Sequence, residues 1–204
     1  MKKIFSNSEI KSEEQFFLIL KKKKIVVYLP DSHIENVFSA MSDAGAGIIG
    51  DYNKCSFRIA GIGTFKPKNV TNPFSGKKNM INFENEIRIE MECNSKNLNR
   101  VVTAMLKAHP YEESAYEIYD FVKFEKNVSG CVIELNRKTK LKVILNKLNI
   151  NFKSEKNLTD STIKRIVITE NLFTDKIRES AEYFDSDLVL ICRNNKYKLF
   201  NLLQ

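Results

Sequence analysis

The segment at 107–121, KAHPYEESAYEIYDF, holds the densest group of side chains in the chain that could do chemistry. It contains His109, one of only two histidines, followed by Tyr111 and the adjacent carboxylates Glu112 and Glu113. Imidazole and carboxylate groups bind zinc-like ions, and an imidazole can exchange protons near neutral pH. The types and spacing of these residues therefore mark the segment as the first place to look for a site.

Two interpretations of His109 differ in what the histidine does. In the first, His109 and Pro110 end a helix and form a structural seam, because a partly positive imidazole near a helix C-terminus interacts favourably with the helix dipole and proline blocks continuation. In the second, His109 and Glu112 bind a divalent metal ion, with Asp31 and His33 contributing from the other end of the sheet. The seam is the favoured interpretation.

The paired glutamates leave a third interpretation open. Consecutive residues of an extended segment point to opposite faces, so Glu112 and Glu113 are not expected to bind the same ion. Two adjacent carboxylates beside a histidine are nevertheless more charge than a seam requires, which favours the metal site. A polar network at a subunit interface would account for them.

Three other residues are candidates for a ligand or interface role. His33 falls in the first turn of a predicted helix, where positive charge is unfavourable, so we expect it to be neutral and exposed. Cys55 lies beside Lys54 and Arg58, which could lower its thiol pKa, but no histidine is near and a structural thiol is favoured. Phe74, in the loop NPFSG, either packs on its own sheet or is presented to a partner.

The elements that must position these residues follow from hydrophobic periodicity. A capping box at Ser32 and Glu35 opens one predicted helix, and Gly45 stops it. Gly61 and Gly63 are expected at a bulge or bend of a hairpin. The predicted order is a strand at 24–30, a helix at 32–45, a hairpin at 48–67, a loop at 69–80, a strand at 86–93, a helix from 94 or 95 to 108 and a strand at 116–121. This βαββαβ order predicts an α+β, ferredoxin-like sheet with two helices on one face.

A smaller unit is expected after this domain. The pattern predicts a helix at 141–148, a strand at 163–169, a helix at 174–184 and a strand at 187–192. A strand, a helix and a strand of these lengths form a crossover, so the two strands should be parallel. We therefore divide the chain into an N-terminal segment at 1–23, either a helix or an arm, a ferredoxin-like domain at 24–122 and an α/β region at 123–204.

Composition limits the partners and the compartment. The net charge is +8, yet residues 25–122 hold ten Lys or Arg against twelve Asp or Glu, so the excess lies in the two flanks. No aromatic residue is interleaved with the lysines at 21–24, so a solvated basic face is favoured over nucleic-acid binding. The four cysteines contain no Cys-x-x-Cys pair, and no apolar run approaches the roughly 18 residues of a membrane span. We expect a cytoplasmic protein with reduced thiols and no membrane partner.

Several motifs together resemble one family. HIENVFSAMSDAGAGIIGDYNKCSF, GIGTFKP, NPFSG, EIRIEMEC and AHPYEESAYEIYDF are similar in order and spacing to the YqfO-type domain, which is PII-like or CutA-like. That domain occurs alone or as an insertion in a family of dinuclear-metal hexameric proteins named GTP cyclohydrolase 1 type 2 homologues. The resemblance covers about residues 24–122. It implies self-association through sheet edges, as a trimer or higher, and a ligand that the sequence does not identify.

The tail resembles the same family more faintly, and its departures are chemical. SGCVIEL at 129–135 is similar to a Gly-x-x-Gly-Glu-Leu-like stretch of the family. The family's Gly-Gly-Ser-Gly turn corresponds to 170–173, where Leu172 and Phe173 would obstruct a ligand. Its Gly-Asp-x-Lys-Tyr-His motif corresponds to 193–198, where asparagines and a lysine replace the metal-binding groups. The family's N-terminal His-His-Pro motif and its last His/Glu ligand pair have no counterpart.

The resemblance and its departures lead to two functional hypotheses. The favoured one is a non-enzymatic, oligomeric binding or regulatory module whose metal-centre ligands have been lost, with no cofactor. The alternative is a divergent metal-dependent hydrolase, similar to the GTP cyclohydrolase 1 type 2 homologues, which would require a divalent metal ion. Binding of nucleic acid by the basic flanks is a weaker third possibility.

Overall fold

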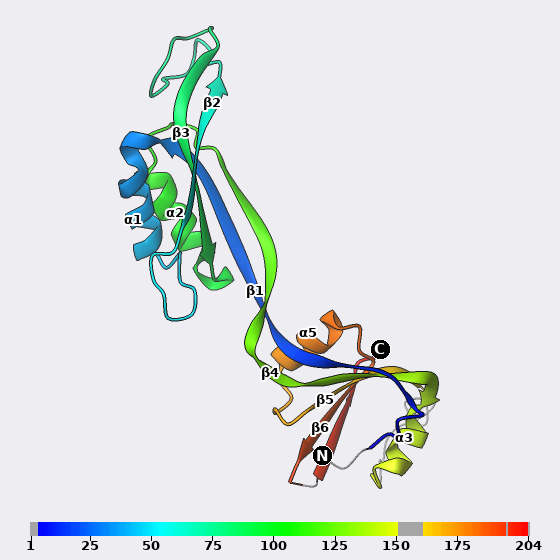
Figure 1. The fold of residues 1–204 in the computed structure, drawn as a ribbon. Helices are drawn as coiled ribbons and strands as arrows, with labels where there is room; N and C mark the ends of the chain where they lie inside the picture. Colours follow the sequence, from blue (N-terminus) through cyan, green and yellow to red (C-terminus); the bar gives the residue numbers. More distant parts are fainter. Residues whose placement is uncertain (1–3, 151–160, 195, 204) are drawn as a thin grey trace. The chain divides into compact units, whose positions relative to one another are not determined.

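The structure, a computed structural model, describes residues 4–150, 161–194 and 196–203, and the chain divides into two compact units. Unit 1 consists of Met1–Leu20 and Phe124–Gln204, and unit 2 of Lys21–Lys123. The long strands β1 (Ile10–Pro30) and β4 (Tyr116–Lys140) contribute residues to both units, as Figure 1 shows.

Unit 2 has a sheet in the order β2-β3-β1-β4, with β2 at Phe57–Phe65 and β3 at Asn82–Cys93. Strand β3 is antiparallel to both β1 and β2. The Tyr28 N–H donates to the Ala115 carbonyl at 3.1 Å, and Lys23 contacts Asp120 at 2.5 Å, so β4 also runs antiparallel to β1. Helices α1 (Ile34–Asp43) and α2 (Leu98–Ala108) complete the predicted βαββαβ order, which is confirmed.

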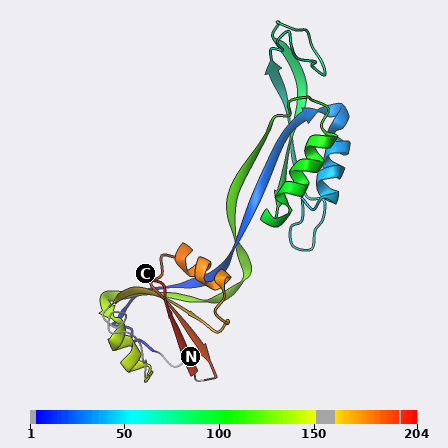
Figure 2. The same cartoon turned by 180° about the vertical axis from the view of Figure 1, so that it is seen from behind.

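The core of unit 2 lies between the sheet and its two helices, which cover one face in Figures 1 and 2. Strand β3 turns Ile89, Met91 and Cys93 into this core, as the alternation at 86–93 predicts. Burying a side chain of this size stabilises the fold by about 1.5–3 kcal/mol. The fully buried members are Ile25, Val27, Leu29, Val37, Met41, Ile89, Val101 and Met105.

The start of α1 differs from the predicted capping box. A short 3₁₀ turn, η1 (Asp31–His33), precedes the helix, and no side chain caps either element. The Ser32 hydroxyl instead contacts His33 Nδ1 at 2.9 Å, and Glu35 forms an ion pair with Arg58 at 2.6 Å. The second helix likewise starts through a 3₁₀ turn, η2 (Ser95–Asn97), without a side-chain cap.

The prediction of a hairpin within 48–67 is also wrong. Strand β2 pairs with β3 instead, and residues 66–81 form the connecting loop. The register runs without interruption from Phe57 opposite Glu90 to Phe65 opposite Asn82, so Gly61 and Gly63 do not lie at a bulge. Neither glycine has a positive φ.

Unit 1 has the strand order β1-β4-β5-β6-β7. Strand β5 (Thr162–Thr169), helix α5 (Asp175–Tyr183) and strand β6 (Leu188–Arg193) form the expected crossover, and β5 and β6 are parallel. Strand β7 (Lys196–Asn201), which the sequence analysis did not predict, is antiparallel to β6. Residues 10–23 belong to β1, so the helix considered for this stretch is absent there.

Alternate residues of the unit 1 strands fill two separate cores. Ile166, Ile168, Leu188 and Leu190 share one cluster with helix α3 (Leu141–Lys147). The intervening side chains, Val167, Val189 and Ile191, share a second cluster with α5. Phe16 and Val132 also belong to this second cluster. Apolar residues on both faces are expected for strands with helices on each side.

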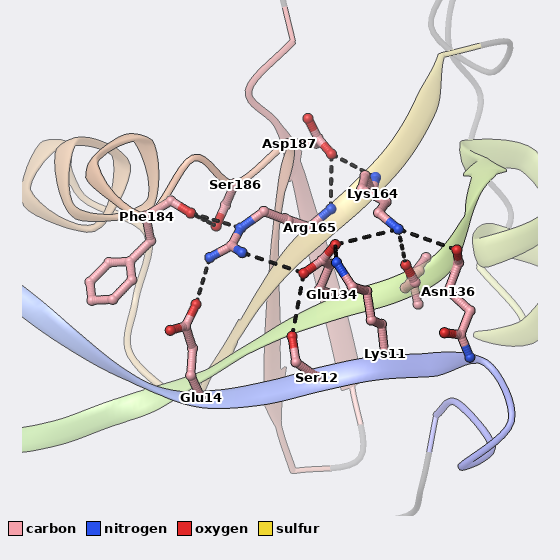
Figure 3. A network of polar contacts seen from close by, with 11 residues as sticks. Lys11, Ser12, Glu14, Glu134, Asn136, Lys164, Arg165, Phe184, Ser186 and Asp187 are labelled. Atoms are coloured by element: carbon pink, nitrogen blue, oxygen red, sulfur yellow. Dashed lines mark hydrogen bonds and ion pairs between the residues drawn. The ribbon is translucent and has the colours of Figure 1, made fainter.

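A polar network joins several elements of unit 1, and Figure 3 shows it at close range. Glu134 contacts Lys11 at 2.8 Å, Lys164 at 3.4 Å and Arg165 at 3.9 Å, and Arg165 also contacts Glu14 at 2.5 Å. The Lys11 ammonium, followed by that of Lys164, lowers the pKa of the Glu134 carboxyl. We call these five residues the Glu134 network.

Among the described residues, no helix combines the length and apolar character needed to cross a membrane.

Candidate functional site

A cavity of about 330 Å³ lies within unit 2, where the end of β2, the 66–81 loop and the segment after α2 meet. We call it the Tyr111 cavity. Its lining includes four of the eight residues singled out from the sequence: Phe74, Tyr111, Glu112 and Glu113. The remainder comes from the β2 end, the loop, β3 and the residue before β4: Gly63, Thr64, Phe65, Lys66, Pro67, Thr71, Pro73, Ser75, Glu86 and Ala115.

The imidazole of His109 forms hydrogen bonds with two backbone groups, one of them from the cavity residue Tyr111. Its side chain is buried, and Nε2 lies 2.9 Å from the Tyr28 carbonyl, to which it can only donate. Nδ1 therefore accepts the Tyr111 N–H, at 3.1 Å. Burial lowers the pKa of His109, so the ring is neutral with its proton on Nε2. Both nitrogens are occupied, which fits the seam and corrects the partly positive imidazole of the sequence analysis.

Tyr111 carries the polar centre of the cavity. Its hydroxyl donates to Glu86 Oε1 at 2.9 Å, and its ring lies 4.9 Å from that of His109, edge to face. Burial, followed by the hydrogen bond to Glu86, raises the pKa of Tyr111. The phenol therefore stays protonated, with its hydrogen directed at the Glu86 carboxylate.

Gly63 makes room for that carboxylate. A Cβ at position 63 would lie 2.3 Å from Glu86 Oε2, whereas one at Gly61 would meet nothing within 4 Å. Because neither backbone needs a glycine, the requirement at position 63 comes from the side chain of Glu86. The two residues are not directly paired, since Gly63 is opposite Glu84 and Gly61 is opposite Glu86.

Phe74 connects the loop to two other elements. Its ring lies 5.7 Å from that of Tyr111 and 5.3 Å from that of His33, so it does not simply pack on its own sheet. The side chain is still 47% exposed. His33 is half-buried beneath it, rather than fully exposed as expected.

The 110–113 segment is bent, not extended, and this changes the prediction for its glutamates. Both Glu112 and Glu113 border the cavity because alternation does not apply to a bend. Glu112 accepts the Asn72 N–H at 2.9 Å and so ties the segment to the loop. No hydrogen bond or ion pair joins Glu113 to any residue that the structure describes.

The formal charges that border the cavity are unequal. Three carboxylates, Glu86, Glu112 and Glu113, line it together with one ammonium, Lys66. The sequence analysis missed Glu86 and Lys66, although Glu86 has the same parity as the outward-facing residues of β3. Its proximity to Tyr111 depends on how β2 and β3 pair, which spacing along the chain does not reveal.

Besides His109 and His33, two further singled-out residues do not line the cavity. Asp31 is exposed in η1. Cys55 is half-buried in the preceding loop, where its N–H donates to the Gly47 carbonyl at 2.8 Å. Arg58, considered as a partner for that thiol, instead pairs with Glu35 and lies over the Phe38 ring at 4.7 Å.

The described residues do not fit a metal centre. Across 4–150, 161–194 and 196–203, no three His, Cys, Asp or Glu side chains converge to hold an ion.

At the position of the family's glycine turn, Phe173 stacks on Phe200 with 3.8 Å between ring centroids, and Leu172 is exposed. The Thr174 hydroxyl accepts the Ile177 N–H at 3.3 Å and so caps α5.

No family model matches the chain. Curated proteins named GTP cyclohydrolase 1 type 2 homolog do match it. The protein from Halalkalibacterium halodurans is 48% identical over 96 residues, 47% of this chain and 26% of that protein. The protein from Bacillus subtilis is 36% identical over 152 residues, 72% of this chain and 40% of that protein. A crystal structure of a Bacillus cereus protein related to NIF3 matches with a TM-score of 0.46 and 25% identity, over 91% of this chain and 50% of that one.

The length of the Bacillus subtilis match shows how far the similarity extends. A match of 152 residues cannot fit within Lys21–Lys123, so it includes part of unit 1. The matched part of the chain covers less than half the length of either of these two relatives. The chain is therefore similar to a part of the longer proteins named GTP cyclohydrolase 1 type 2 homolog.

Proposed function

We propose that this chain is a non-enzymatic, self-associating binding or regulatory module, with the Tyr111 cavity as its ligand site. The observation that carries the proposal is the cavity itself. About 330 Å³ is within the range of small-molecule sites, and aromatic walls beside a few polar groups are typical of them. The cavity also gathers half of the eight residues singled out from the sequence.

The chemistry of the donor groups supports binding over metal-dependent hydrolysis. His109 uses both nitrogens on backbone partners, so it has no lone pair left for an ion. Glu112 is engaged by the Asn72 N–H. The alternative, a divergent hydrolase, rests on the name of the relatives, and it needs a metal site that the described residues do not provide.

Metal analysis and ligand mapping together test the proposal. Protein purified without added metal should contain far less than one equivalent of zinc, iron or manganese by elemental analysis. Binding of small aromatic fragments, followed by amide shifts in NMR spectra, should centre on Tyr111 and the 66–81 loop. Near-stoichiometric metal that is lost in Glu112→Gln, a variant of an exposed residue, would favour the hydrolase instead.

Self-association is supported by exposed apolar side chains on the β2–β3 hairpin. Ile62 and Phe83 are 70% and 71% exposed, and Phe57 is 62% exposed. Strand β2 ends the sheet order, so its free edge could pair with another strand. We propose that a second copy of the chain covers this hairpin in a trimer or higher oligomer.

Sedimentation velocity over a wide concentration range tests the oligomer. Ile62→Lys combined with Phe83→Lys should dissociate it, because two charges would be placed in an apolar contact. Val70→Lys, at an exposed apolar position of the 66–81 loop, is the matched control and should leave the oligomer intact. A monomeric wild-type protein at all concentrations would overturn this part of the proposal.

We also propose a cytoplasmic location. The support is that all four cysteines are free thiols, as expected for a reducing compartment.

A further inference from the structure

The walls of the Tyr111 cavity set the size and shape of what it can hold. Its volume of about 330 Å³ is near the lower limit of ligand pockets, which suits a body of one ring with a short tail. Phe65, Phe74 and the prolines Pro67 and Pro73 supply apolar surface. A small aromatic or cyclic body would be desolvated against these side chains.

The charges select the sign of the ligand. An anion in the cavity would be close to three carboxylates and could be balanced only by Lys66. A cation would be attracted by the three carboxylates and repelled only by Lys66. Glu113 has no hydrogen-bond or ion-pair partner among the described residues, so it can bind a cation without breaking an existing contact.

Tyr111 adds a second reason for a cation. Its O–H is committed to Glu86, so its oxygen faces any further ligand as an acceptor rather than as a donor. The rings of Phe74 and Tyr111 lie 5.7 Å apart, and the electron-rich face of an aromatic ring attracts an ammonium group. Acceptor oxygens beside aromatic faces match an ammonium group better than a carboxylate or a phosphate.

From this arrangement we infer that the Tyr111 cavity binds a small organic amine, with its ammonium at Glu113 and Glu86 and its apolar body against Phe65 and Phe74. The inference rests on the proposed function, because it names the ligand class of the same cavity. It assigns a charge-recognition role to Glu113 and an orienting role to the Tyr111–Glu86 pair.

Three probes that share one body isolate the contribution of charge. We would measure calorimetric affinities for 2-phenylethylamine, 2-phenylethanol and 3-phenylpropionate, which end in an ammonium, a hydroxyl and a carboxylate. The amine should bind about tenfold more tightly than the alcohol, the value of one charge-assisted hydrogen bond. The carboxylate should bind most weakly, and only the binding of the amine should weaken as salt is raised.

Glu113→Gln then tests the residue. This side chain is exposed, so its substitution should leave the circular dichroism spectrum and the unfolding midpoint unchanged. The affinity for 2-phenylethylamine should fall about tenfold, while that for 2-phenylethanol should stay the same. Glu182→Gln makes the same chemical change at an exposed position of α5 in unit 1 and should alter neither affinity.

The outcomes separate this inference from the proposed function. Equal binding of the amine and the alcohol would overturn the ligand class and leave the cavity as a binding site. Tighter binding of the carboxylate would overturn the class in the same way. Failure of all three probes would also overturn it, whereas the proposed non-enzymatic function is decided separately by the metal content of the purified protein.

Discussion

The two units use their carboxylates in different ways. In unit 1, Glu134 contacts three cations, and Arg165 is shared with Glu14, so each charge of the Glu134 network has a partner of opposite sign (Figure 3). In the Tyr111 cavity of unit 2, three carboxylates line the space with a single ammonium. The first arrangement joins elements, and the second leaves an excess of negative charge around the cavity.

This difference shows that the number of acidic residues in a region does not reveal whether their charges are paired. The Glu134 network has exposed ion pairs, and such pairs contribute little to stability and less in salt. The carboxylates of the cavity have fewer oppositely charged partners than Glu134 has. Aromatic side chains and the buried, neutral His109 lie beside them. Variants of the two regions should therefore differ in both the size and the kind of their effects.

The largest effect is expected at the seam beneath the cavity. His109→Ala removes both ring contacts and leaves the Tyr28 carbonyl and the Tyr111 N–H without their partner. The free energy of unfolding should fall by roughly 2–3 kcal/mol, the cost of leaving buried polar groups unsatisfied. Urea denaturation monitored by circular dichroism measures this change. An unchanged midpoint would show that the seam does not stabilise unit 2.

A pH-dependent effect should follow from the same residue. The pKa of His109 is 6.5 in the unperturbed state and lower in the folded chain, so as the pH falls the unfolded chain takes up the proton first. The histidine therefore stabilises the fold fully above pH 6.5, and this stabilisation is lost as the pH falls from there toward the lower folded pKa. The loss is at most about 1.4 kcal/mol per pH unit.

His109→Gln checks this effect, because glutamine can still donate a hydrogen bond but does not titrate. Denaturation at a series of pH values should show a shallower dependence below 6.5 in this variant than in the wild-type chain. Parallel curves for the wild type and His109→Gln would assign the pH dependence to other groups.

A smaller effect is expected at the glycine that accommodates Glu86. Gly63→Ala places a Cβ against a flexible carboxylate, so the fold should persist while Glu86 moves away from Tyr111. The affinity for 2-phenylethylamine should fall between about twofold and tenfold, the range of one hydrogen bond. In Gly61→Ala the added Cβ has no neighbouring atom within 4 Å, so this variant should bind 2-phenylethylamine as tightly as the wild type does. Equal losses in both variants would point to a general effect of alanine in β2.

The smallest effect is expected in the Glu134 network. Glu134→Gln should lower the thermal midpoint slightly at low salt, because Lys11, Lys164 and Arg165 then lose their shared carboxylate. The difference should disappear near about 1 M salt, where charges are screened over a few ångströms. Glu182→Gln provides the control for loss of an exposed charge. A large, salt-independent decrease would show that packing, rather than charge, holds this region.

Periodicity predicted most of the fold because the apolar stripes were regular. The alternation at 86–93 and the stripe at 141–148 both correspond to observed elements, and the crossover rule gave the parallel pair β5 and β6. The early part of β1 was missed since its pattern also fits a helix, and its pairing with β4 decides the outcome. Strand β7 was missed because its sequence was interpreted as a remnant of a family motif.

The candidate site was predictable only in part. Tyr111, Glu112 and Phe74 stood out because the sequence already groups them with a histidine or a proline-glycine loop. Glu86 and Gly63 could not be joined to them, since their contact depends on the pairing of β2 with β3. The expectation for the two glutamates failed because it assumed an extended backbone where the structure has a bend.

The histidine seam has a consequence for which substitutions the region around it can accept. Both partners of the His109 ring are main-chain groups, which every amino acid supplies except for the N–H that proline lacks. Exchanges of neighbouring side chains can thus accumulate while the imidazole keeps its anchorage. Selection for binding of a different small molecule could change the side chains that line the cavity one residue at a time, without disturbing the hydrogen bonds of His109.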